Sequence, residues 1–225
     1  MSRPARLVKA LKVRTGHPFQ QFGQKNDART RNGATGCTDT VLQYLILLWN
    51  KVYVTHDEIR TVAGVSGAPP RGLYPREVQK VCDHYGLPYV VRTGLSWQDI
   101  LIFARRAPVA LGHSYSYWPE WQGAEYAGKK ADGRPNGYAQ PLRRAGRTQL
   151  AGFVPPNDRH MGVIFGRSTQ GNIFGWEPNH GSPARPEHPA YEWMEEIQFR
   201  RVVGSYEKVF GMPSYALVPT RSLPL

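Results

Sequence analysis

The segment NGATGCTDTVLQYLILLWN, residues 32–50, decides the fold because it joins a glycine-rich turn to a strongly apolar helix pattern. Apolar residues occupy positions 41, 42 and 44–49, which is nearly every side of a helix. Such a pattern is typical of a helix buried in the core. The sequence therefore predicts a central helix over residues 38–51, with Cys37 at its start and Asp39 in its first turn, where a carboxylate favours the helix dipole.

The position of Cys37 suits a nucleophile. The thiolate is the reactive form of cysteine, and a helix N-terminus and a nearby imidazolium both stabilise it. The glycine-rich turn lets the backbone approach a substrate closely, and the Cys37 amide would point toward a developing oxyanion. Cysteine is also a common core residue. We expect that role for Cys82, which lies on the apolar face of a predicted helix over residues 74–85.

A histidine that could act as the base lies far along the chain. His160 opens the predicted strand HMGVIFG, residues 160–166, behind a polar loop. The next strand ends at Trp-Glu-Pro-Asn, so the carboxylate of Glu177 or the amide of Asn179 could orient the imidazole ring. Nucleophile, base and orienting group would then be complete. His113 is the competing base.

The predicted elements indicate an α+β fold, with helices first and antiparallel strands later. Residues 1–31 are predicted to form a basic extended arm, residues 32–212 one domain with a long loop insertion at 113–155, and residues 213–225 a proline-containing tail. Thr55 with Glu58 three residues later, and Ser96 with Asp99, have the spacing of helix capping boxes. Helices are predicted over residues 38–51, 55–63, 74–85 and 96–105, and strands over residues 87–92, 108–111, 160–166, 172–176, 199–203 and 215–218.

The 225-residue chain carries a net charge of +12. Basic residues concentrate in residues 1–31 and 129–147, which favours a polyanionic partner such as nucleic acid, anionic lipid or a cell-wall polymer. A solvated basic face, or an arm that docks on an acidic protein, explains the charge equally well. Nucleic-acid binding rests on charge alone, because the sequence contains no helix-turn-helix, zinc-finger or RNP signature.

Several classes of protein are excluded by motif. Two cysteines are too few for a disulfide framework or a CxxC zinc cluster. The basic N-terminus lacks the apolar core of a secretory signal, and the longest apolar run is too short to span a bilayer. We therefore expect synthesis in the cytoplasm and no membrane span. The absence of a phosphate loop and of a dinucleotide fingerprint predicts no cofactor.

The order of four segments resembles a known family. The glycine-rich turn with its cysteine is followed by PRGLYPREVQKVCDHYGLPYVV (70–91), SWQDILIFARRAPVALG (96–112), and HMGVIFG with GNIFGWEP (160–166 and 171–178). This order resembles the papain-like cysteine-peptidase domain that cleaves double-glycine leaders in bacteriocin-exporting transporters, together with its stand-alone bacterial and phage relatives. The resemblance covers roughly residues 24–178, and it lies in the order of the elements, since no single motif is strong.

The resemblance implies a papain-like fold in which N-terminal helices pack on a C-terminal antiparallel sheet. It also implies Cys37 as nucleophile, His160 as base and Glu177 in the place of the family's aspartate, with Asn179 as its substitute. Gln24 would take the role of the oxyanion glutamine, although it lies 13 residues before the cysteine, farther than is usual in the family. A threonine also replaces the glycine that usually follows the cysteine.

The sequence thus predicts a cysteine peptidase or amide hydrolase that acts on a peptide or on a peptidoglycan crosslink, plausibly encoded by a phage and associated with the virion. A wall amidase of the CHAP type is the competing enzyme, but its cysteine-to-histidine spacing is generally shorter than the 123 residues found here. The alternative is a catalytically inert papain-like fold that serves as a structural component of a phage tail or capsid. Its basic arm would then contact neighbouring virion proteins or nucleic acid.

Overall fold

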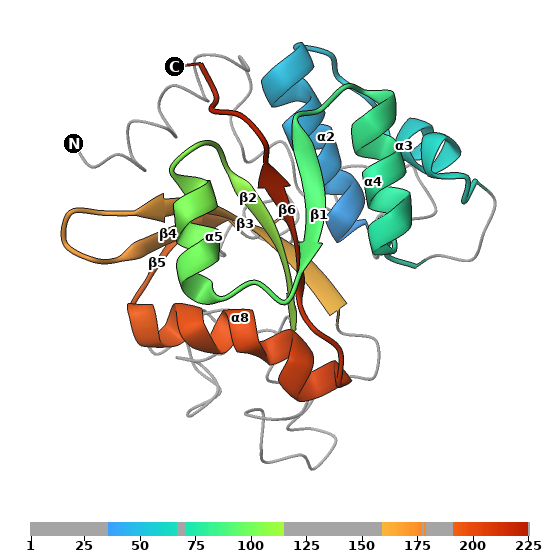
Figure 1. Ribbon diagram of the computed structural model, residues 1–225. Coiled ribbons are helices and arrows are strands. Elements are labelled where there is room, and N and C mark those ends of the chain that lie inside the picture. The colour runs from blue at the N-terminus through green and yellow to red at the C-terminus, as the bar shows by residue number, and fades with distance from the viewer. Residues whose placement is uncertain (1–35, 67–70, 115–158, 177, 179–190, 225) are drawn as a thin grey trace, which may run out of the picture.

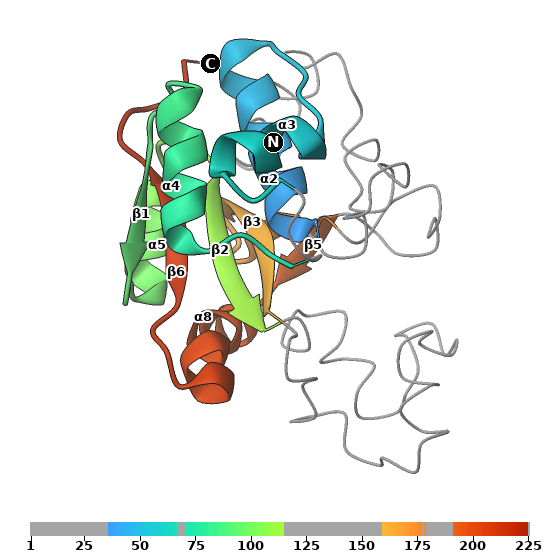
Figure 2. The ribbon, with the colours of Figure 1, turned by 90° about the vertical axis from the view of Figure 1, so that its right-hand side faces the viewer.

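A computed structural model describes residues 36–66, 71–114, 159–176, 178 and 191–224 of the chain. Its centre is a six-stranded sheet with the strand order β1-β6-β2-β3-β4-β5, in which all neighbouring strands are antiparallel. Helices cover both faces of this sheet (Figures 1 and 2). The strands are β1 (Tyr89–Thr93), β2 (Val109–Ser114), β3 (Arg159–Arg167), β4 (Ile173–Trp176), β5 (Tyr191–Met194) and β6 (Tyr215–Pro219).

Helix α2 (Cys37–Asn50) is the predicted central helix. Every residue from its start to position 48 is buried, polar ones included, because α2 packs between the sheet and the two following helices. It ends where Lys51 adopts the left-handed conformation that often terminates helices. The buried helix expected from the apolar pattern is therefore confirmed to within one residue at each end.

Two shorter helices pack beside α2 on the same face of the sheet (Figure 1). Helix α3 (His56–Ala63) begins at the predicted capping box, since the Thr55 side chain accepts from the Glu58 amide. Helix α4 (Pro75–His84) begins with a proline, whose missing amide hydrogen costs nothing in a first turn. These local signals set the helix boundaries independently of the rest of the fold.

The opposite face of the sheet is covered by α5 (Trp97–Ala104) and α8 (Glu196–Phe210). The side chains of strand β3 contribute to two separate hydrophobic cores, one on each face of the sheet. Met161, Val163 and Phe165 belong to the core shared with α2, whereas Ile164 belongs to the core shared with α5 and α8. Because successive strand side chains point to opposite faces, β3 contributes to both cores. The prediction of an α+β fold, with helices packed on an antiparallel sheet, is confirmed.

The predicted strand over residues 199–203 is wrong, because these residues lie inside helix α8. Taken alone, these five residues have the composition of a short strand. The buried residues of the helix, however, are spaced as on one helix face: Phe199, Val202, Val203 and Tyr206. Strand β5, just before this helix, was not predicted.

The strand predicted over residues 215–218 is confirmed as β6, but the segment predicted to be a tail is not separate from the domain. The segment 213–225, predicted to be a tail, contains β6, which pairs with both β1 and β2 inside the sheet. It is therefore part of the domain. Of the predicted insertion at 113–155, His113 and Ser114 belong to β2, and the remainder lies outside the described residues, as does the predicted arm. No helix in the described ranges is both long and apolar enough to cross a membrane.

Candidate functional site

Cys37 is the first residue of α2 and is buried, with 5% of its surface exposed. Gly36 forms the N-cap and has no side chain with which to cap the helix. The first amides of α2 therefore receive no side-chain acceptor from the N-cap, although a helix normally leaves such donors to be satisfied. The Cys37 Sγ lies 3.8 Å from the Thr38 Oγ1. The thiol therefore lies at the positive end of a helix whose N-cap residue supplies no side-chain acceptor.

His160 is the second residue of β3 and is largely buried. Its cross-strand partner is His113 on β2, and the two imidazole rings lie 5.5 Å apart at an angle of 74°. The His113 Nδ1 donates to the Ser114 carbonyl at 2.9 Å. In the neutral ring this leaves Nε2 as the acceptor nitrogen. The two histidines that competed for the role of base are therefore direct neighbours.

The register of the sheet determines which face these histidines occupy. β2 and β3 pair without a bulge from Val109↔Ile164 to His113↔His160. Ile164 packs with α5 and α8, so alternation places the His160 side chain on that same face. Cys37 belongs to the core on the α2 face. The start of α2 and the start of β3 lie at the same end of the sheet (Figures 1 and 2), but the two side chains leave from different faces. Their pairing stays a prediction.

The remaining predicted site residues cannot be compared with this geometry. Glu177 and Asn179 follow β4, and Gln24 precedes α2, and all three lie outside the described residues. Their roles as orienting group and oxyanion donor therefore stay predictions.

A buried ion pair supports the first turn of α2. Asp39 accepts from Arg60 on α3, with 2.7 Å to Nη2 and 2.9 Å to Nε, and both side chains are almost fully buried. Burial raises the pKa of Asp39 to about 6, although the Arg60 guanidinium lowers it. Arg60 also donates to the Arg71 carbonyl at 2.7 Å. The pair thus ties the helix that carries Cys37 to α3 and to the chain entering α4.

Sequence reasoning missed the role of Arg60. Asp39 was assigned to the helix dipole, and the amphipathic pattern of α3 gave no reason to bury an arginine. The one signal was a carboxylate on a helix that is otherwise apolar on nearly every side, since a buried charge needs a partner.

Aromatic residues gather beside the Cys37 end of α2. The rings of Tyr206 on α8 and Tyr215 on β6 lie 5.8 Å apart, and both belong to the same core as Cys37. Burial raises the pKa of Tyr206, the Arg159 guanidinium lowers it and the Cys37 thiolate raises it. Arg159 and Cys37 therefore both lie within electrostatic reach of this hydroxyl. Tyr215 packs so closely on Gly112 of β2 that a Cβ there would lie 2.9 Å from its ring.

Cys82 differs from Cys37 in its position on its helix, since it is far from the helix N-terminus. It lies within α4, is fully buried, and belongs to the main core. Burial raises the pKa of its thiol to about 12. Cys82 is therefore the core residue that the sequence predicted. Among the described residues, no three His, Cys, Asp or Glu side chains come together as a metal site would require.

Comparison with known proteins gives a similarity to solved structures. No protein-family model matches the sequence, and no curated protein matches it significantly. Among solved structures, the chain is similar to the crystal structure of a "putative C39-like peptidase" from Bacillus anthracis. The match has 12% sequence identity and a TM-score of 0.48, and it covers 83% of this chain and 90% of the other. An activity for this chain must therefore be argued from its own residues.

Proposed function

We propose that the protein is a cysteine peptidase or amide hydrolase with Cys37 as its nucleophile. The observation that carries the proposal is the position of Cys37 as first residue of the buried helix α2, at an N-cap without a side-chain acceptor. Helix N-termini of this kind stabilise both a thiolate and an oxyanion. The order of the sequence motifs supports the same reaction class.

In this mechanism the Cys37 Sγ attacks the carbonyl carbon of the scissile amide, and His160 takes the thiol proton. The Cys37 amide, with Gln24, stabilises the negative charge on the carbonyl oxygen. His160 then returns the proton to the leaving amine, and the C–N bond breaks to leave a thioester. Water hydrolyses this thioester, with His160 again as the base. Glu177 or Asn179 orients the His160 ring.

The neighbouring His113 gives the mechanism a second imidazole at the same end of the sheet. Its ring lies 5.5 Å from that of His160, and its Nδ1 is held by the Ser114 carbonyl. His113 would therefore be fixed in one tautomer beside the base. We expect it to position the His160 ring, since its own ring is fully buried.

The substrate is a peptide or the peptide crosslink of a bacterial cell wall. The support is the net charge of +12, because cell-wall polymers are anionic and opposite charges accelerate encounter. A protein of this kind would suit a phage that must degrade the wall, made in the cytoplasm and carried by the virion. The basic N-terminal segment would then contact neighbouring virion proteins or, less specifically, nucleic acid.

The test is hydrolysis of purified peptidoglycan and of a mixed-sequence peptide pool, followed by mass spectrometry. Cys37→Ala should abolish the release of new amino termini, whereas Cys82→Ala is the matched control and should retain it in the fraction that folds. Activity that survives in Cys37→Ala, or no new amino termini from the wild-type protein on either substrate, would refute the proposal.

One observation favours the inert alternative, a structural virion component. Alternation places His160 on the α8 face, whereas Cys37 belongs to the α2 core. This separation of the two side chains is what a fold that has lost its catalytic Cys-His pair would show. It predicts that Cys37 reacts with alkylating reagents no faster than an ordinary thiol, and that Cys37→Ala leaves every property of the assembled particle unchanged.

A further inference from the structure

We infer that Arg159 gives the Cys37 site its substrate preference, by binding a carboxylate of the peptide to be cleaved. This inference rests on the proposed function. It names the class of substrate, which is a peptide with either an acidic side chain or a free terminal carboxylate near the scissile bond. Arg159 is the first residue of β3 and is exposed to solvent.

Arg159 is held in place by aromatic rings. Its guanidinium carbon lies 5.1 Å from the ring centroid of Phe210 and 5.9 Å from that of Tyr206, both on α8. A guanidinium stacked on a ring keeps its N–H donors at the edge, where a carboxylate can accept two parallel hydrogen bonds. The stacking therefore orients a cation without consuming its donors.

The charge of Arg159 is not neutralised within the described part of the chain, where it forms no ion pair with an acidic residue. Some other arginines of the described residues are paired with acidic side chains. Arg71 is bonded at both of its terminal nitrogens to Glu77, at 2.6 and 2.8 Å. Arg167 and Arg200 both contact Glu196, at the other end of α8. As far as the described residues are concerned, an anion that approaches this end of the sheet meets Arg159 as an exposed cation without an acidic partner.

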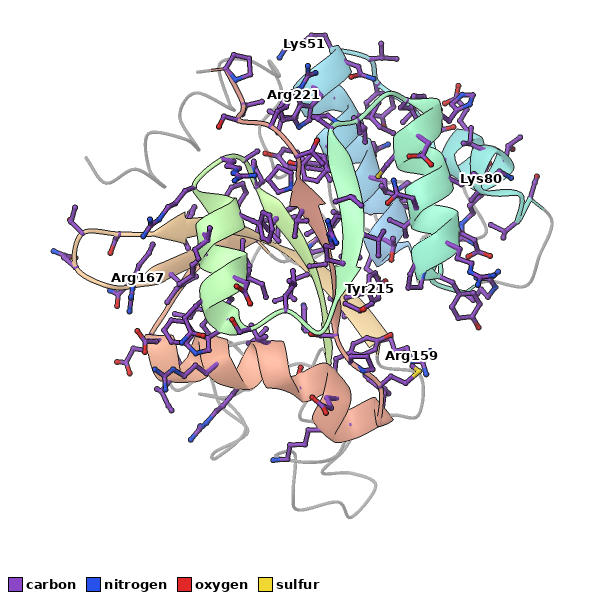
Figure 3. All side chains as sticks on the ribbon, in the orientation of Figure 1. Lys51, Lys80, Arg159, Arg167, Tyr215 and Arg221 are labelled. Atoms are coloured by element: carbon purple, nitrogen blue, oxygen red, sulfur yellow. The ribbon has the colours of Figure 1, made fainter. Side chains whose placement is uncertain are left out.

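The path from Arg159 to Cys37 runs through two tyrosines. Arg159 contacts the Tyr206 ring, which lies 5.8 Å from the Tyr215 ring, and Tyr215 shares the buried core with Cys37. Figure 3 shows Arg159 and Tyr215 at the same end of the sheet, where Figure 1 shows the start of α2. The influence of both Arg159 and Cys37 on the pKa of Tyr206, after the larger effect of burial, agrees with this arrangement.

Paired alkylating reagents test the inference without a known substrate. Iodoacetate and iodoacetamide attack the same thiol, but only iodoacetate carries a carboxylate. The rate constants at Cys37 are measured for both reagents by peptide mapping of the intact protein, and their ratio is compared with that of free cysteine. Arg159→Gln removes the charge. Arg200→Gln is the matched control, because Arg200 of α8 also stacks on a ring, that of Trp97 on α5 at 4.4 Å, but lies at the other end of α8.

We expect the iodoacetate-to-iodoacetamide ratio at Cys37 to exceed that of free cysteine and to fall about threefold in Arg159→Gln, which is the effect of removing a unit charge about 6 Å from the reagent carboxylate in a water-like dielectric. Added salt should reduce the wild-type ratio in the same direction. Arg200→Gln should keep the wild-type ratio. N-acetyl-alanine, which has a terminal carboxylate, and N-acetyl-glutamate α-amide, which has only a side-chain carboxylate, are added as competitors. The one that slows the labelling more identifies the kind of carboxylate that Arg159 prefers.

The possible failures are distinguishable. A ratio equal in the wild type and in Arg159→Gln, with Cys37 still reactive, overturns the inference and leaves the proposed function standing. A Cys37 that is alkylated no faster than Cys82 overturns the proposed function, and the inference with it. A ratio that falls equally in Arg200→Gln shows a general effect of net charge and also overturns the assignment to Arg159.

Discussion

Replacing Arg60 by leucine should strongly destabilise the fold by isolating a buried charge. Arg60 pairs with Asp39 at 2.7 Å, and the exposed fractions of the two side chains are 2% and 1%. Removing one partner of a buried ion pair typically costs about 3–5 kcal/mol, because the other charge stays uncompensated. We therefore expect Arg60→Leu to lower the free energy of unfolding near neutral pH by about 4 kcal/mol.

The loss of folding stability in Arg60→Leu should be larger near neutral pH than at acidic pH. Burial raises the pKa of Asp39 in the folded protein to about 6, above the ordinary value of 3.8. The folded state therefore binds more protons than the unfolded state between about pH 4 and pH 6. In the wild type, this group's contribution falls as the pH rises through that window, by about 3 kcal/mol at most. Arg60→Leu should raise the pKa of Asp39 further, so its penalty should shrink on acidification.

Urea unfolding followed by tryptophan fluorescence, at about pH 5 and about pH 8, measures both effects. The double variant Asp39→Leu/Arg60→Leu should recover most of the loss, since well-packed apolar residues often replace a buried ion pair without cost. Arg200→Gln is the matched surface control, because its pair with Glu196 is solvent-exposed, and it should lower the free energy of unfolding far less than Arg60→Leu does. An Arg60→Leu penalty below about 1 kcal/mol, or one independent of pH, would refute the reasoning.

The packing and capping of the fold give two further predictions. Gly112→Ala should destabilise by about 1–3 kcal/mol, because the new Cβ would lie 2.9 Å from the Tyr215 ring and 3.2 Å from its carbonyl oxygen. Gly204→Ala, within α8 and with open space around it, should instead stabilise by about 0.5–1 kcal/mol, so thermal unfolding of the two variants should shift in opposite directions. Thr55→Ala should cost about 1 kcal/mol through loss of the α3 capping box with Glu58, and an unchanged melting temperature would show that the cap is not formed in solution.

The parts of the fold that follow from local rules could be predicted from the sequence. α2 was recognisable because a helix apolar on nearly every side must be buried, and α3 and α5 because their capping boxes occupy four consecutive residues. The prediction for residues 199–203 was wrong because a short apolar run fits both the two-residue period of a strand and the 3.6-residue period of a helix. Only the buried position of Tyr206, farther along, identifies the segment as a helix. The strand over residues 215–218 was recognisable locally, but its place inside the sheet was not, because β6 pairs with strands about 100 residues earlier in the chain.

The candidate site was predictable in its elements but not in its geometry. The sequence placed Cys37 at a helix start and His160 at a strand start, as found. The face on which His160 lies depends on strand register, and a shift of one residue reverses it, so no local pattern could supply it. The stacking of Arg159 on α8 and the pairing of Asp39 with Arg60 are contacts between elements distant in sequence, and they emerge only from the packed fold.

The most direct test of the central claim is the pH dependence of iodoacetamide labelling at Cys37, with Cys82 as internal reference. An ordinary thiol loses reactivity about tenfold for each pH unit below its pKa, because only the thiolate reacts. If Cys37 is a nucleophile activated by the helix N-terminus and an imidazolium, its labelling rate should change less than about threefold between about pH 8 and about pH 6. A rate that falls about tenfold per unit across that range, or labelling no faster than that of Cys82, would contradict the account.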